Sequence, residues 1–71
     1  MTREQAMEIR TALADLIDAI DRADRASAAR EALPPGSTRA RVTTANAKWS
    51  NAARYRVGLE ARFRALVEAA L

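Results

Sequence analysis

The chain has 71 residues, a net charge of +3, and no cysteine or histidine. This length allows one small domain, and the missing residue types exclude disulfides, zinc–thiolate sites, thiol nucleophiles and histidine-based proton transfer. No apolar run approaches the roughly 20 residues that span a bilayer, and the first ten residues lack the apolar stretch of a signal peptide. A cytoplasmic location is therefore expected. Eleven Arg against one Lys, with 18 Ala, indicate a GC-rich coding bias, typical of a bacterial or phage protein.

The first predicted helix covers about residues 2–33, which contain no Gly or Pro and consist mostly of good helix formers. Thr2 and Gln5 have the spacing of a capping box, in which each side chain accepts a hydrogen bond from the other residue's backbone N–H. Apolar or small residues then alternate in steps of three and four, at positions 6, 9, 13, 16, 20 and 23. This heptad-like stripe is the expected contact face of the helix.

Residues 34–37 are predicted to form a tight turn. Pro34 disfavours helical geometry at the residue before it, Pro35 repeats that restriction, and Gly36 permits the reversal of direction. Ser37 and Thr38 are both good N-caps for a following helix. A short turn between two helices of nearly equal length predicts an antiparallel hairpin.

The second predicted helix covers about residues 38–70 and repeats the three–four rhythm. Its stripe consists of Val42, Ala45, Trp49, Ala52, Arg56, Leu59, Phe63, Leu66 and Ala70. The charges of the two halves are complementary, since residues 1–33 carry a net −2 and residues 34–71 a net +5. The predicted fold is thus all-α: one coiled-coil-like, antiparallel two-helix hairpin over residues 1–71.

Folding the chain about Gly36 sets large residues against large ones near the termini and large against small near the turn. We therefore expect the indole of Trp49 to be largely shielded. Arg56 interrupts the stripe, and two interpretations stay open: its guanidinium reaches out to a carboxylate, Glu60 or Asp15, or it fixes register at a cost in stability. The expected pairs are Ile9 with Phe63, Leu13 with Leu59, Ile20 with Ala52 and Ala23 with Trp49.

A second apolar strip lies beside this stripe on both helices. A two-helix structure cannot bury it, so the strip is the predicted interface with another copy or with a larger protein. The hairpin is expected to dimerise into a four-helix bundle or to dock on a larger assembly. The strip consists of Met7, Ala14, Ile17, Ala53, Val57, Val67 and Leu71. The other side is expected to carry Ala12, Ala19, Ala26, Asn51, Gly58 and Ala65, where Gly58 either admits a close helix or is simply tolerated.

Basic residues gather near the turn, and they are candidate contacts for an acidic partner or for phosphate. The candidates are Arg30, Arg39, Arg41 and Lys48. With three aromatic residues in the chain, no platform for stacking RNA bases is visible. Direct membrane binding is not expected, because the second helix needs its apolar stripe against the first.

No residue pattern indicates catalysis or the binding of a cofactor, metal or small-molecule substrate. The acidic residues at 15, 18, 21 and 24 drift around the helix, so we interpret them as a solvated face that pairs with Arg22 and Arg25. We predict a non-enzymatic interaction or assembly protein (a subunit, adaptor, regulator or inhibitor) that acts through its helix faces. The alternative is a nucleic-acid-associated protein that contacts phosphate through the turn and the second helix.

Overall fold

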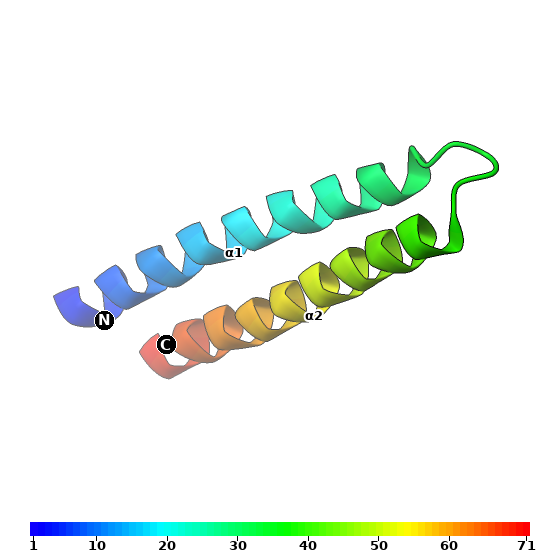
Figure 1. The fold of residues 1–71 in the computed structure, drawn as a ribbon. Coiled ribbons are helices and arrows are strands. Elements are labelled where there is room, and N and C mark those ends of the chain that lie inside the picture. Colours follow the sequence, from blue (N-terminus) through cyan, green and yellow to red (C-terminus); the bar gives the residue numbers. More distant parts are fainter.

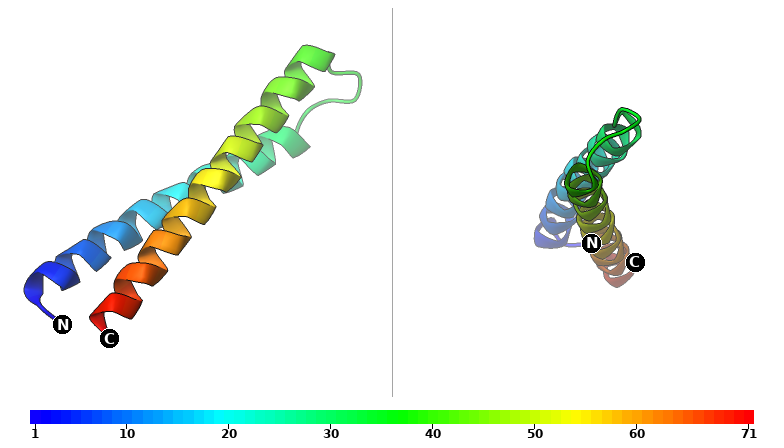
Figure 2. Two further views of the ribbon diagram at one scale, coloured as in Figure 1. Left: turned by 90° about the horizontal axis from the view of Figure 1, so that it is seen from below. Right: turned by 45° about the vertical axis from the view of Figure 1, so that its right-hand side comes forward.

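The protein is a helical hairpin, and the computed structural model describes all 71 residues (Figure 1). Helix α1 spans Arg3–Glu31 and helix α2 spans Arg39–Ala70. The two helices pack against each other in opposite directions, with both termini at one end and the turn at the other. Turned views show that the helices cross along their length (Figure 2). The molecule measures 55 × 13 × 12 Å. The predicted all-α hairpin is confirmed.

The start of α1 has the predicted capping box. The backbone N–H of Gln5 donates to Oγ1 of Thr2 at 3.1 Å, and the N–H of Thr2 donates to Oε1 of Gln5 at 2.8 Å. Both bonds satisfy N–H groups that the first helical turn leaves without a backbone partner.

The turn is slightly longer than predicted, because α1 ends at Glu31 rather than at residue 33. Gly36 adopts a positive φ of 84°, the left-handed conformation that favours glycine. Of the two expected N-caps, Thr38 takes the role: its side chain accepts from the N–H of Arg41 at 3.3 Å. Ser37 instead closes the turn, since its hydroxyl donates to the carbonyl of Pro34 at 2.6 Å.

The face that α1 turns toward α2 differs from the predicted stripe. Its buried residues are Ala12, Leu16, Ala19 and Ala23, whereas Leu13 is 41% exposed. The assignment of Ala12 and Ala19 to an open side is therefore wrong, and Leu13, which was expected inside the seam, lies at its edge. Small side chains at the seam allow the two backbones to approach closely. The large apolar residues beside them are left at its edge.

Helix α2 contributes the larger side chains to the seam, and none of them is fully covered. The half-buried residues largely follow the predicted stripe, from Ala45 through Leu59, Phe63 and Leu66 to Ala70. Trp49 departs from it with 39% exposure, so the prediction of a shielded indole is wrong. Instead the guanidinium carbon of Arg30 lies 4.5 Å from the centre of its ring, a cation–π contact at the surface.

Replacing each of the two glycines by alanine is expected to change stability in opposite directions. A Cβ at Gly58 would meet no atom within 4 Å, and alanine in a helix interior is favoured over glycine by about 0.5–1 kcal/mol. Gly58→Ala should therefore raise the melting temperature. Gly36→Ala also meets open space but has to adopt the positive φ, which costs an L-residue about 1–2 kcal/mol. Thermal unfolding followed by circular dichroism measures both; a destabilising Gly58→Ala would indicate a helix docked at that position.

Candidate interaction surface

One side of the hairpin carries Leu13, Ile17 and Val57, three of the large apolar residues that the seam leaves exposed. In α1, Leu13 lies four residues after Ile9, and Ile20 lies four residues after Leu16. Ile17 lies four residues after Leu13. A step of four turns about 40° around a helix. In α2, the same step of four residues leads from Trp49 to Ala53 and on to Val57. It also leads from Phe63 to Val67.

Because the two helices are antiparallel, the same step reaches the same side of the hairpin in both. We call this side the apolar face. Its residues are Leu13, Ile17 and Ile20 from α1 and Ala53, Val57 and Val67 from α2.

The predicted interface strip is thereby divided between several environments. Ile17 and Val57 are 58% and 64% exposed and lie on the apolar face, while Ala53 and Val67 are half-buried at its inner edge. Leu71 is the C-cap of α2 and is almost fully exposed. Met7 and Ala14 are exposed too, but helical spacing places them farther round α1, away from α2.

Leu13 was predicted to lie inside the seam but is 41% exposed, and Ile20, predicted there too, is half-buried. Both were placed in the seam because they belong to the three–four stripe of α1. Their three- and four-residue spacing from Ile17 was the signal that relates them to the exposed strip.

A groove of about 500 Å³ opens on the apolar face toward the free ends of the helices. Glu60, which lines this groove, accepts a hydrogen bond from the Nε of Arg56 at 2.9 Å, and both side chains are about 40% exposed. This confirms the interpretation in which Arg56 packs its stem and reaches out to a carboxylate. The pair also neutralises the charge of Glu60. The groove is lined by Leu16, Glu60, Phe63, Arg64, Val67 and Glu68.

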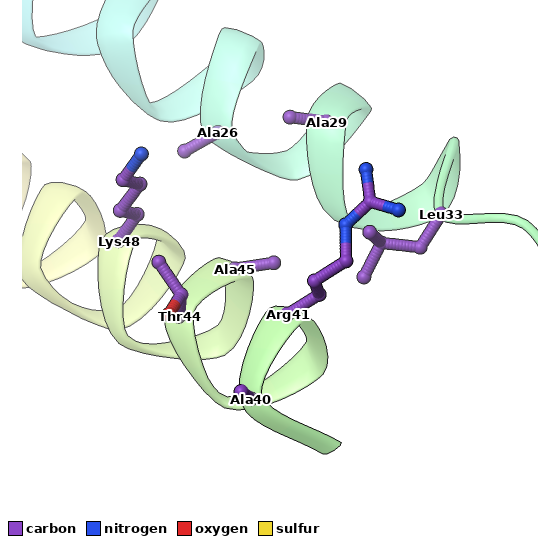
Figure 3. Close-up of a pocket in the computed structure, with 8 residues that line it drawn as sticks. All are labelled: Ala26, Ala29, Leu33, Ala40, Arg41, Thr44, Ala45 and Lys48. Carbon is purple, nitrogen blue, oxygen red and sulfur yellow. The ribbon is translucent and has the colours of Figure 1, made fainter. Parts of the chain in front are cut away.

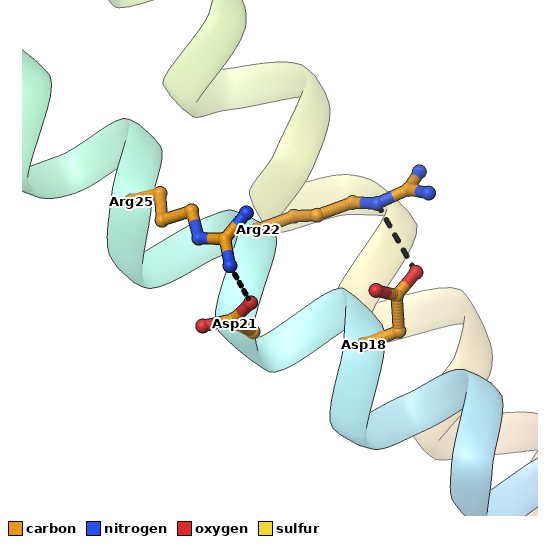
Figure 4. Close-up of polar contacts among 4 residues, drawn as sticks. All are labelled: Asp18, Asp21, Arg22 and Arg25. Carbon is orange, nitrogen blue, oxygen red and sulfur yellow. Dashed lines mark ion pairs between the residues drawn. The ribbon is translucent and has the colours of Figure 1, made fainter.

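The outer surface of α1 is charged and solvated. Asp18 pairs with Arg22 at 3.1 Å and Asp21 with Arg25 at 2.8 Å, with more than half of each side chain exposed (Figure 4). The predicted pairing of these acids with arginines one turn on is confirmed. No group of three acidic, His or Cys side chains is placed to hold a metal ion.

A second groove, of about 370 Å³, lies beside the turn (Figure 3). Its floor is mostly alanine from both helices, and Arg41 and Lys48 line it from α2. The other two predicted phosphate contacts are elsewhere: Arg39 is exposed at the start of α2, and Arg30 lies over Trp49. None of these four cations forms an ion pair within the chain. The remaining lining residues are Ala26, Ala29, Leu33, Ala40, Thr44 and Ala45.

Neither helix is long and apolar enough to cross a membrane. Comparison of the chain with models of protein families, with curated proteins and with solved structures finds no match.

Proposed function

We propose that the protein is a small non-enzymatic interaction or assembly protein whose apolar face is covered by helices of a protein partner. The observation that carries this proposal is the amount of surface left open. The hairpin exposes 5577 Å², whereas a compact monomer of 7.8 kDa exposes about 4,400 Å². The excess of about 1,200 Å² is larger than the roughly 800 Å² that each partner buries in a standard protein interface.

The chemistry of the apolar face favours helices as the covering element. Leu13, Ile17 and Ile20 form a ridge with spacings of four and three, the pattern that fits the grooves of another helix. Only four residues of the hairpin are buried, and three of them are alanines, so the hairpin by itself has a very small core. Contact with further helices enlarges this core, so binding and stability are coupled.

A photo-reactive residue in place of Val57 tests whether a protein covers the apolar face in the producing cell. We expect irradiation to yield a covalent adduct with a protein. The matched control replaces Tyr55, which is similarly exposed at 51% but flanks the opposite side of the seam. Equal adducts from both positions, or none from Val57, would contradict the proposal.

Contact with nucleic acid is a second candidate function, supported by the free cations around the turn. Arg41 and Lys48 line one groove and Arg39 lies beside it, so a phosphate backbone can meet several charges at once. Under this alternative, changing Arg39 and Arg41 together to Ala weakens binding and reduces the salt slope by about two.

A filter-binding titration at two salt concentrations separates the two candidate functions. Under the proposed protein-binding function, we expect weak, non-specific binding to RNA or DNA that disappears in the saltier buffer. A salt-resistant, sub-micromolar complex would favour the nucleic-acid function instead.

A further inference from the structure

We propose that the partner is a second copy of this chain, packed apolar face to apolar face with its turn at the opposite end. This inference rests on the proposed function and names its partner. The two-fold axis passes beside Ile17, so that α1 packs on α1 of the second copy and α2 on α2. In this arrangement the two hairpins form an antiparallel four-helix bundle. Its interface is isologous, because both copies contribute the same surface.

The charge order along one row of α1 carries the inference. Arg3, Arg10, Ile17, Asp24 and Glu31 follow one another at intervals of seven, so they form a single row on the exposed part of the helix. The row has two cations at one end, two acids at the other and an isoleucine in the middle. Such a row is complementary to itself when it is reversed.

A two-fold axis at Ile17 sets residue i of α1 level with residue 34−i of the second copy. Arg10 then meets Asp24 of the second copy, Arg3 meets Glu31, and each contact occurs twice. The neighbouring row gives the apolar centre, where Leu13 lies close to Ile20 of the second copy. The four charges are exposed, and none of them forms an ion pair within its own chain.

The charges also select between the two symmetric ways of stacking the hairpins. With both turns at the same end, α1 packs on α2 of the second copy, and Arg10 then lies near Arg64. With the turns at opposite ends, Arg64 lies level with the neutral Asn46 of the second copy, and Val57 lies near Ala53. The second arrangement avoids the contact between Arg10 and Arg64 and sets Arg10 against Asp24 and Arg3 against Glu31.

Charge reversal on this row tests the arrangement by sedimentation equilibrium. We expect the wild type to be a dimer at micromolar concentration. Arg10→Glu and Asp24→Arg should each weaken it about tenfold, because each change creates two like-charge contacts. An equimolar mixture of the two variants should regain the wild-type affinity as a heterodimer. The matched controls Arg62→Glu and Asp15→Arg make the same charge changes on the opposite side and should leave the dimer unchanged.

Cysteine crosslinking tests the position of the axis, since the chain has no cysteine of its own. Ile17→Cys should oxidise readily to a disulfide-linked dimer, because a residue beside the axis lies next to its own copy. Arg10→Cys should not crosslink with itself, since 14 helical residues separate the two copies by about 21 Å, beyond the roughly 7 Å limit for Cα atoms in a disulfide. In a mixture of the Arg10→Cys and Asp24→Cys variants, we expect a disulfide-linked heterodimer.

The outcomes distinguish failure of the dimer from failure of the proposed function. A wild-type protein that is still monomeric at about 100 µM, a concentration that corresponds to about −5.5 kcal/mol, would overturn the dimer. Failure of the Arg10→Glu and Asp24→Arg mixture to recover the wild-type affinity would overturn it too. A protein adduct at position 57 that contains a different chain would then still support the proposed function. Circular dichroism of each variant shows whether helicity is retained, and the cysteine pairs report geometry even where an affinity change is small.

Discussion

Leu16→Ala is expected to remove most of the cooperative folding of the protein. Leu16 is the one large side chain among the four buried residues, at 9% exposure, and it also lines the groove on the apolar face. Truncating a buried Leu costs about 2–5 kcal/mol. A stable domain of this length has only about 4–11 kcal/mol in total. The hairpin has no second buried residue of similar size to compensate.

Thermal unfolding of Leu16→Ala, followed by circular dichroism, measures this effect. We expect the melting temperature to fall by at least about 10 °C. Val42→Ala is the control, because Val42 is a partly exposed aliphatic residue near the turn and its truncation should cost less than about 1 kcal/mol. Similar losses from the two variants would show that the seam is not centred on Leu16.

Local signals in the sequence were sufficient to predict the hairpin. The Thr2–Gln5 pair, the two prolines, Gly36 and the Thr38 cap act through contacts within a few residues, and each occurs in the structure with little change. The stripe of α2 was also largely predicted. Its large apolar residues follow one face, so the period alone identifies the side that turns inward.

The rotation of α1 could not be predicted in the same way. Its apolar and small residues cover a wide arc, with Ala12 and Ala19 on one edge and Leu13, Ile17 and Ile20 on the other. Burying the larger residues is the usual expectation, but α2 already supplies Leu59, Phe63 and Leu66 to the seam. Alanines opposite these side chains bring the helices together without overpacking. Which part of the arc turns inward depends on this complementarity across the pair.

The contact of Arg30 with Trp49 has a related cause. The sequence predicted that the indole would lie over Ala23, because counting from Gly36 sets the two residues opposite each other. Alanine is too small to cover the ring, however, and the long side chain of Arg30 reaches it from the last turn of α1. Counting along the two helices predicts which residues lie level with each other, but it does not predict how far a flexible arginine reaches.

Ile17→Asp is expected to convert the proposed dimer to monomers. In the antiparallel arrangement each copy of Ile17 lies beside the other at the two-fold axis, so one substitution removes two buried aliphatic side chains. Their burial is worth about 1.5–3 kcal/mol each, and the two carboxylates that replace them face each other without a cation. The dissociation constant should therefore rise by at least about 100-fold, the equivalent of about 2.7 kcal/mol.

Sedimentation equilibrium at several protein concentrations measures the change, with Tyr55→Asp as the matched control. Tyr55 is nearly as exposed as Ile17 but flanks the opposite side of the seam, so its replacement should leave the dimer intact. Because dimerisation enlarges the core, the melting temperature of Ile17→Asp should also lose the dependence on protein concentration that the wild type shows. Equal effects of the two substitutions would mean that the hairpins do not meet through the apolar face. A dimer of Ile17→Asp with wild-type affinity would place the axis elsewhere on α1.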